Sequence, residues 1–93
     1  MSEIQVRDNA EAHRFEASRD GGLAGFAEYR LRDGVITFTH TEIDPAFEGQ
    51  GIGSALVRWA LDDVRGRGLR VVPICPFVKG WIEKHPDYAD LVD

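Results

Sequence analysis

The spacing of apolar residues changes near the middle of this chain, and this change limits the possible folds more than any other feature of the sequence. Up to residue 43, apolar and polar residues alternate, which is the period of half-buried β-strands. Beyond the pair Asp44-Pro45 and a glycine-rich turn, apolar residues recur every three or four positions, which is the period of an amphipathic helix. The pattern therefore predicts an α+β fold, with antiparallel strands first and helices second.

We predict four strands in the first half, the first of them weak, at residues 4–7, 13–18, 23–31 and 35–43. The last is the strongest, because its Val, Ile and three Thr residues are β-branched and it contains neither Gly nor Pro. Asp33-Gly34 suits a tight hairpin, so this strand is expected to pair with the one before it. In the second predicted strand, Phe15 and Glu16 point to opposite faces of the sheet.

The second half predicts a helix from Gly51 to about Arg67, whose apolar side is formed by Ile52, Leu56, Trp59, Ala60 and Val64. The apolar run at 69–74 predicts a buried strand, and a second, short helix opens at Cys75-Pro76 and stops at Pro86. Because the strand at 35–43 reaches the run at 69–74 through a helix, these two strands are expected to be parallel. The result is a mixed sheet covered by helices on at least one face.

The composition is that of one small globular domain, with 93 residues of which 43% are hydrophobic. Sixteen acidic residues against eleven basic ones give a formal charge of −5, which argues against a nucleic-acid partner because phosphate neutralisation needs basic patches. The single cysteine excludes an intrachain disulfide. Because no signal-peptide pattern and no membrane-length apolar run is seen, we expect a cytoplasmic protein without a membrane partner, either a monomer or a weak dimer.

The glycine-rich turn reads Glu48-Gly49-Gln50-Gly51-Ile52-Gly53-Ser54-Ala55 and leads into the first predicted helix. Glycines at alternate positions remove Cβ atoms, so that backbone N–H groups can approach a ligand closely. The first N–H groups of a helix lack internal partners, and the helix dipole adds partial positive charge there. The turn therefore favours a phosphate or pyrophosphate ligand. The alternative is that the glycines only form a turn and allow helix and sheet to pack closely.

Two other phosphate-binding motifs do not fit this turn. A P-loop requires Gly-Lys-Ser/Thr, and no Lys precedes Lys79 in the sequence. A dinucleotide-binding fold requires G-x-G-x-x-G inside a parallel βαβ unit, whereas the spacing here is G-x-G-x-G and antiparallel strands precede it.

The turn resembles the acyl-CoA signature Gln/Arg-x-x-Gly-x-Gly/Ala of the GNAT superfamily of N-acetyltransferases, with Glu48 in the place of the Gln or Arg. Three further segments resemble a minimal subfamily of GNAT-like proteins and extend the resemblance over nearly the whole chain: His40-Thr41-Glu42, Pro73-x-Cys75-Pro76-Phe77 and His85-Pro86-x-Tyr88. The resemblance implies one GNAT-like domain over residues 1–93, with an antiparallel meander followed by β-α-β-α. The two helices that shape the acceptor pocket near the N-terminus of full-size relatives have no counterpart in this sequence.

The resemblance also implies an N-acetyltransferase that uses acetyl-CoA as co-substrate, needs no metal, and moves the acetyl group to a small amine or a lysine side chain. By resemblance, CoA would contact the end of the strand at 35–43 and the start of the helix after it, through Thr41, Ile43, Gln50, Gly51, Ile52, Gly53, Ser54 and Ala55. Two alternatives remain open. The chain is either a non-catalytic accessory or sensor domain that binds CoA or acetyl-CoA, or a structural domain whose glycines only form a turn.

Three residues are candidates for catalysis. His40 and Glu42 share a face of their strand beside the turn, and either can accept a proton from an amine; the structural alternatives are a hydrogen-bonded His in the sheet and a Glu paired with an Arg. Cys75 is expected at a helix N-terminus, which favours a nucleophilic thiolate, and its alternative role is that of a small buried apolar residue beside the cofactor. His85 has no second ligand at helical spacing, so no metal site is predicted.

Overall fold

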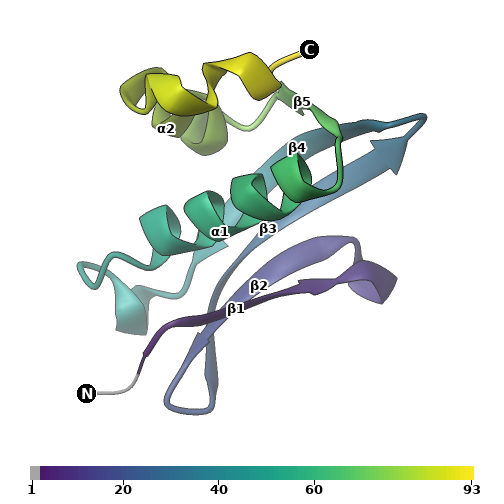
Figure 1. Cartoon of the computed structure of the whole chain (residues 1–93). Helices are drawn as coiled ribbons and strands as arrows, with labels where there is room; N and C mark the ends of the chain where they lie inside the picture. The colour runs from purple at the N-terminus through teal and green to yellow at the C-terminus, as the bar shows by residue number, and fades with distance from the viewer. Residues whose placement is uncertain (1–2) are drawn as a thin grey trace.

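One five-stranded sheet is the framework of the computed structural model, which describes residues 3–93 (Figure 1). Its strands lie side by side in chain order: β1 (Gln5–Asn9), β2 (Arg14–Arg19), β3 (Gly22–Arg32), β4 (Val35–Ile43) and β5 (Arg70–Pro73). β1 to β4 form an antiparallel meander, and β5 pairs with β4 in parallel. The predicted mixed sheet and its order of elements are confirmed.

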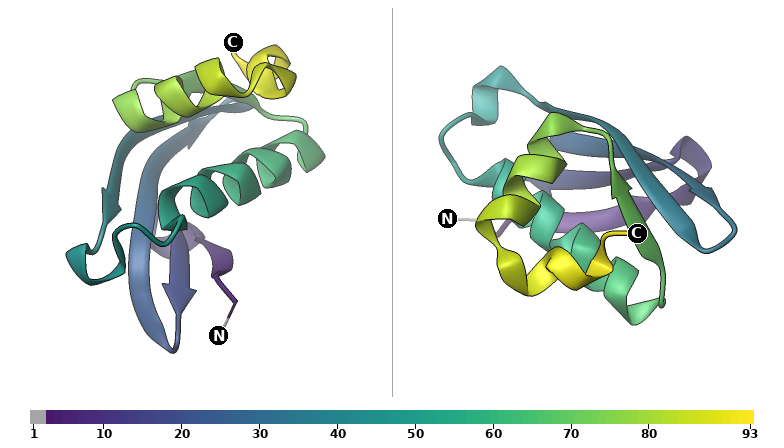
Figure 2. Two further views of the ribbon diagram at one scale, coloured as in Figure 1. Left: turned by 90° about the vertical axis from the view of Figure 1, so that its left-hand side faces the viewer. Right: turned by 90° about the horizontal axis from the view of Figure 1, so that it is seen from above.

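Two α-helices, α1 (Ile52–Gly66) and α2 (Pro76–Lys84), pack against each other and on the same side of the sheet (Figure 2). Within residues 3–93, no α-helix covers the opposite face, which we call the helix-free face. Short 3-10 segments complete the fold at Ala10–Ala12, Pro45–Phe47 and Pro86–Leu91. Neither of the two α-helices is long and apolar enough to cross a membrane.

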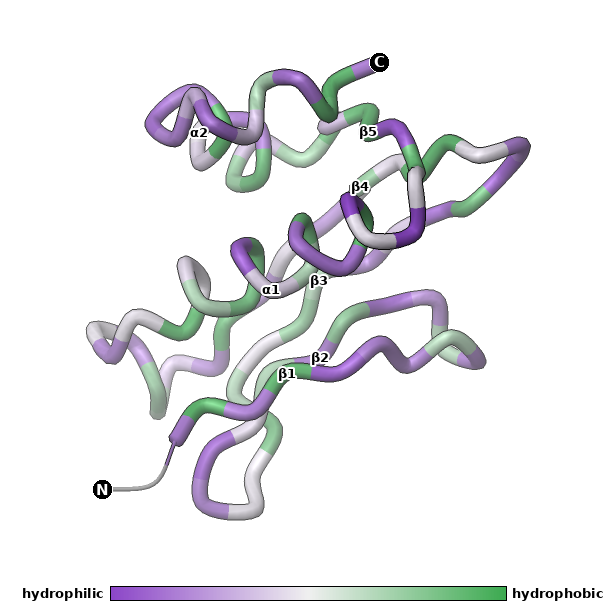
Figure 3. The backbone as a smooth tube through the Cα atoms, in the orientation of Figure 1, coloured by the Kyte–Doolittle hydropathy of each residue, from purple (hydrophilic) through white to green (hydrophobic). Residues whose placement is uncertain are grey.

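The core lies between α1 and the sheet. Phe15 and Phe38 are buried there from the strands, and hydrophobic residues recur on successive turns of α1 (Figure 3). The buried side of α1 also includes Val57 and Leu61, whereas Trp59, predicted on this side, is 40% exposed. Because α1 contacts α2 as well as the sheet, its buried sector is shifted from the one that the spacing alone predicts.

An irregularity in the pairing of β3 with β4 changes which side chains of β4 face the core. Glu28 lies opposite His40, but the next residue, Tyr29, lies opposite Phe38, so that Thr39 is an extra residue in β4. Such a β-bulge reverses the alternation, since side chains on a strand have a period of two.

The bulge decides which face of the sheet carries the predicted catalytic pair. Before it, Ile36 and Phe38 are buried in the core. After it, Thr41 occupies the core side and is half-buried, whereas His40 and Glu42 are exposed on the helix-free face.

The strand predicted at residues 69–74 is shorter than expected, because the chain leaves the sheet at Pro73. Ile74, predicted to be buried, is 64% exposed. On the far edge of β5, Val71 forms a parallel bridge with Val92, and the N–H of Asp93 donates to the carbonyl of Val71 at 2.8 Å. The end of the described chain therefore covers this edge of the sheet.

Candidate functional site

β4 and β5 separate halfway along β4, and part of the β4 edge is left unpaired. The parallel register ends with Phe38 opposite Pro73, and the last backbone contact is the N–H of Cys75, which donates to the carbonyl of Phe38 at 2.9 Å. Within residues 3–93, no backbone group pairs with residues 39–43 on this side of the strand. We call this stretch the unpaired edge of β4.

The backbone groups of Thr41 and Ile43, both predicted to contact CoA, face the unpaired edge. The N–H of Asp44 donates to the carbonyl of Ala24 on β3 at 2.8 Å, and successive residues of an antiparallel ladder turn their backbone groups to alternate sides. Thr41 and Ile43 therefore present their N–H and C=O groups away from β3. An extended ligand can pair with such groups as an added strand would.

The first turn of α1 carries donors without acceptors. Gly51 is the N-cap with a φ of 76°, no side chain caps the helix, and no acidic residue lies in its first turn. Within the described chain, the N–H groups of Ile52, Gly53 and Ser54 have no hydrogen-bond acceptor. The N–H of Ala55 differs from them, because it already donates to the carbonyl of Gly51 at 3.1 Å. Three of the predicted donors are therefore available to an anion.

A side-chain hydrogen bond anchors the turn before α1, and the space beside Gly51 in this turn is empty. The side-chain oxygen Oε1 of Gln50 accepts a hydrogen bond from Arg19 Nη1 at 3.1 Å. A Cβ added at Gly51 would meet nothing within 4 Å, and the left-handed backbone of this residue favours glycine. Glu48, the residue that departs from the GNAT signature, is exposed and ends the Pro45–Phe47 segment.

α2 contacts the first turn of α1 directly. The indole N–H of Trp81 donates to the hydroxyl oxygen of Ser54 at 3.0 Å. The ring of Phe77 lies so close to Gly53 that a Cβ there would stand 2.6 Å from the ring atom Cζ. A side chain at Gly53 would therefore displace the ring of Phe77 as well as hinder the close approach of a ligand, and neither contact is visible in the sequence motif.

His40 and Glu42 form a pair on the helix-free face, as their shared strand face predicts. His40 Nε2 lies 3.2 Å from Glu42 Oε2, and the side chains are 56% and 62% exposed. The ring of Phe26, on the neighbouring strand, meets His40 edge-on with the ring centroids 6.2 Å apart. Both side chains are accessible to solvent and to a molecule that approaches this face.

Cys75 lies on the other side of β4. It is the N-cap of α2 with Pro76 at the first helical position, as predicted, but it is only 3% exposed. Its thiol donates to the hydroxyl oxygen of Thr41 at 3.3 Å. The structure thus places Cys75 beside the unpaired edge on the core side, and the His40–Glu42 pair on the opposite face of the same strand.

His85 has a structural environment. Its ring stacks on that of Trp81 with centroids 3.7 Å apart, and its Nδ1 lies 2.7 Å from the carbonyl oxygen of Trp81. Across residues 3–93, no group of three or more His, Cys, Asp or Glu side chains is arranged to hold a metal ion.

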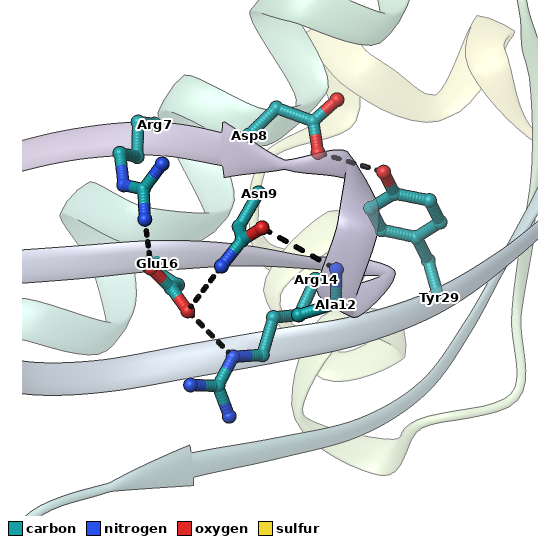
Figure 4. Close-up of polar contacts among 7 residues, drawn as sticks. All are labelled: Arg7, Asp8, Asn9, Ala12, Arg14, Glu16 and Tyr29. Atoms are coloured by element: carbon teal, nitrogen blue, oxygen red, sulfur yellow. Dashed lines mark hydrogen bonds and ion pairs between the residues drawn. The ribbon is translucent and has the colours of Figure 1, made fainter.

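A polar cluster on the helix-free face was not foreseen from the sequence. Glu16 is 9% exposed and accepts hydrogen bonds from Arg7 at 3.0 Å, Asn9 at 3.1 Å and Arg14 at 2.7 Å (Figure 4). Burial would raise the pKa of Glu16, but the hydrogen bonds from Arg14 and Asn9 and the charges of both arginines outweigh it, so the pKa lies below its ordinary value. Strand alternation cannot show that three donors converge on one carboxylate.

The sequence comparisons match the chain to one family model and to one curated relative. The model of the family described as GCN5-related N-acetyl-transferase matches residues 14–91. The chain is also similar to streptothricin acetyltransferase from Streptomyces lavendulae, with 39% identity over 64 residues that make up 66% of this chain and 34% of that protein. The chain thus spans about a third of the length of this curated relative.

The structural comparisons agree with the sequence match. A GCN5-like protein from Staphylococcus aureus superposes with a TM-score of 0.74 over 100% of this chain and 91% of its own, at 24% identity, which shows the shared fold. A GNAT family acetyltransferase from Brucella melitensis, solved in complex with acetyl-CoA, superposes with a TM-score of 0.57 over 69% of this chain and 47% of its own, at 29% identity. On the family match and the shared fold, the chain belongs to the GCN5-related N-acetyltransferase family.

Proposed function

We propose that this chain is an acetyl-CoA-dependent N-acetyltransferase that moves an acetyl group to a primary amine, carried by a small molecule or by a lysine side chain. The observation that carries the proposal is the combination of the unpaired edge of β4 with the acceptor-less N–H groups of Ile52, Gly53 and Ser54. Family membership and the acetyl-CoA bound to the Brucella relative support it.

The residues present fit acetyl-CoA at both of these places. The first turn of α1 would hold the pyrophosphate through the N–H groups of Ile52, Gly53 and Ser54, because free donors and the helix dipole both favour an anion there. The backbone of Thr41 and Ile43 would pair with the amide groups of the extended arm. When bound, acetyl-CoA supplies an acetyl group activated as a thioester.

Glu42 and His40 have the position that a general base needs. A primary amine is a cation at neutral pH and must lose a proton before it can attack a carbonyl carbon. Glu42 would accept this proton, and His40, 3.2 Å away and exposed, would pass it to solvent. His40 can also accept a proton itself and is the alternative base.

Cys75 offers a second route, in which its sulfur carries the acetyl group before the amine does. The burial of the thiol beside Thr41, on the core side of β4, favours the alternative role of a small apolar residue that lines the unpaired edge. Cys75→Ala separates the two: a nucleophile cannot be replaced by Ala without loss of kcat, whereas a lining residue can.

The proposed function is tested by acetyl-CoA calorimetry followed by a CoA-release assay with a broad panel of amines and lysine peptides. We expect saturable acetyl-CoA binding and turnover with at least one amine. Glu42→Gln should lower kcat about 100-fold or more while acetyl-CoA binding stays unchanged. Glu83→Gln makes the same charge change at an exposed site on α2 and serves as the matched control. Absence of acetyl-CoA binding would refute the proposal.

A non-catalytic acetyl-CoA-binding module is the second candidate function. One observation favours it: the one helical element between β1 and β2 is the short 3-10 segment Ala10–Ala12, and no α-helix of residues 3–93 lies over the helix-free face to enclose an acceptor. In that case acetyl-CoA binds, no amine of the panel is acetylated, and Glu42→Gln changes nothing measurable.

A further inference from the structure

We infer that a hollow on the helix-free face, beside Glu42, is the acceptor subsite of this chain, and that it takes the primary ammonium end of a short unbranched alkyl chain. The inference rests on the proposed function, because it names the class of amine that this site would receive. It is carried by the position, size and wall chemistry of the hollow.

The hollow lies where β3 and β4 end side by side, next to the predicted base. Phe26 on β3 is directly opposite Glu42 on β4, so their side chains stand on the same face. Leu23 and Phe26 line the hollow from β3, and Glu42, Asp44 and Pro45 line it from the end of β4 and the segment that follows. An amine held here is therefore next to the carboxylate that would take its proton.

The volume of the hollow favours a small, narrow acceptor. The hollow measures about 160 Å³, whereas sites for drug-sized ligands occupy roughly 300–1,000 Å³. A chain of a few methylenes that ends in an ammonium group fits this space.

The walls divide into an apolar part and an acidic part. Leu23, Phe26 and Pro45 offer carbon surface, and Leu23 is 44% exposed although it is a large hydrophobic residue. Among the described lining residues the charged ones are Glu42 and Asp44. Two basic residues stand just outside the hollow against the ring of Phe26: Arg14, whose Cζ lies 4.4 Å from the ring centroid, and His40. The apolar walls suit the alkyl part of an alkylammonium ion, and the two carboxylates attract its charge. The same carboxylates repel an acceptor that carries a carboxylate or phosphate.

The charge of Asp44 can be removed without loss of the hydrogen bond that its side chain makes to the backbone. Its Oδ1 accepts a hydrogen bond from the N–H of Ala46, which caps the Pro45–Phe47 segment. Asn caps such a segment as well as Asp does, so Asp44→Asn keeps this bond and removes only the charge. Glu83→Gln again provides the matched loss of a charge elsewhere on the surface.

Binding is measured by amide NMR on the full chain with saturating CoA, titrated with n-butylammonium, 1-butanol and butanoate. We expect butylammonium to shift the amides of Leu23, Phe26 and Asp44, and the two other probes to bind more weakly. Asp44→Asn should weaken butylammonium binding about three- to fivefold, as expected for one partly exposed charge pair. Glu83→Gln should leave the affinity unchanged.

Chain length tests the apolar walls. Across ethyl-, propyl- and butylammonium, affinity should rise about two- to fourfold with each added methylene. Leu23→Ser should flatten this dependence while the preference for a cation persists. An equal response to butylammonium and 1-butanol, or shifts confined to other parts of the chain, would overturn the inference.

The outcomes separate this inference from the proposed function. If butylammonium binds in the hollow but no amine is acetylated, the acceptor subsite stands and the catalytic proposal fails. If amines are acetylated while KM for cationic acceptors is unaffected by Asp44→Asn, the catalytic proposal stands and the assignment of this subsite is wrong.

Discussion

The two ends of α1 differ in how completely their polar groups are paired. At the N-terminal end, three N–H groups have no acceptor within residues 3–93, two of the first residues are glycines, and no acidic residue lies in the first turn. At the C-terminal end, charged side chains of the helix are engaged with partners from other parts of the fold. One helix thus carries an end built for stability and an end that is free to receive a ligand.

The pairing at the C-terminal end involves both termini of the described chain. Arg67 contacts Asp63 at 3.1 Å and, on β1, Asp8 at 3.2 Å. The hydroxyl of Tyr88 donates to Asp62 at 2.7 Å, and Arg65 binds Asp90 through two hydrogen bonds. The contact of Arg67 with Asp63 lies within one turn at the end of the helix. The other contacts join the helix to segments that are distant in sequence.

The contrast shows why an unpaired group is informative. Buried or structured polar groups are nearly always satisfied in proteins, and this chain satisfies them at one end of α1. Donors left without acceptors at the other end therefore mark the place where a partner from outside the chain is expected. The predictions below test this contrast, beginning with the largest effect.

The strongest test compares two glycines with the same backbone strain. Gly51, at the free end of α1, and Gly34, in the β3–β4 hairpin, have φ values of 76° and 80°, and an added Cβ meets nothing within 4 Å at either position. Ala at each should cost about 1–2 kcal/mol of stability. Only Gly51→Ala should also weaken acetyl-CoA binding, about tenfold or more if the added methyl group keeps the ligand from one of the three free N–H groups.

Calorimetry with acetyl-CoA and urea unfolding of both variants measure these two effects separately. Equal acetyl-CoA affinity in Gly51→Ala and Gly34→Ala would remove the distinction between the two ends of the helix. Gly53→Val is a poorer choice, because its side chain would press on the ring of Phe77 and disturb α2 as well.

The second test uses alkaline pH at the paired end. Burial and then the hydrogen bond to Asp8, 2.7 Å long, raise the pKa of Tyr29 from 10.0 to about 12. Because the folded pKa is raised, the contribution to stability is complete below pH 10 and is lost as the pH rises through about 12. The free energy of unfolding should fall by about 2 kcal/mol over this range.

Tyr29→Phe lacks the phenol and should not show this decline, although it is less stable at neutral pH because Asp8 loses a donor. Urea unfolding of both proteins at a series of alkaline pH values measures the difference. A decline of the same size in Tyr29→Phe would assign the alkaline transition to other groups.

The third test removes one hydroxyl from the paired end. Tyr88→Phe keeps the buried ring and deletes the hydrogen bond to Asp62, which also raises the pKa of Tyr88, with burial as the second cause. We expect a loss of about 1–2 kcal/mol in the free energy of unfolding, with acetyl-CoA affinity unchanged. A loss of affinity would mean that the two ends of α1 are coupled through α2.

The smallest effect is expected from the exposed pair of Arg65 with Asp90. The hydrogen bonds from Arg65 hold the pKa of Asp90 below its ordinary value, but the side chains of Arg65 and Asp90 are 43% and 64% exposed. Asp90→Asn should therefore lower the melting temperature less than Tyr88→Phe does, and added salt should shrink the difference from the parent. A melting-temperature series in sodium chloride checks this. A larger and salt-independent loss would contradict it.

Much of the fold was predictable because it follows from periodicity. The bounds of β4, the start of α1 and the N-cap position of Cys75 agree with the sequence pattern. The bulge at Thr39 was not predictable, since it depends on how β3 and β4 fit together. The partners of Glu16 were equally hidden, because they come from different strands.

The candidate site also has features that the sequence predicts and features that it does not. The glycines of the turn after β4 predict free backbone N–H groups at the start of α1. The alternation of side chains along β4 predicts that His40 and Glu42 share a face. The contact of Phe77 with Gly53 has no signature in the sequence, because it depends on how α2 lies against α1. Tertiary packing alone decides such contacts.

β4 should report on two different events in hydrogen–deuterium exchange. Its first half, up to Phe38, lies between two strands and should release its amide protons only when the whole sheet opens. The amides of Thr41 and Ile43 face the unpaired edge and should exchange quickly in the free protein. If a ligand slows the exchange of the Thr41 and Ile43 amides alone, the ligand occupies the unpaired edge of β4 and leaves the global stability unchanged.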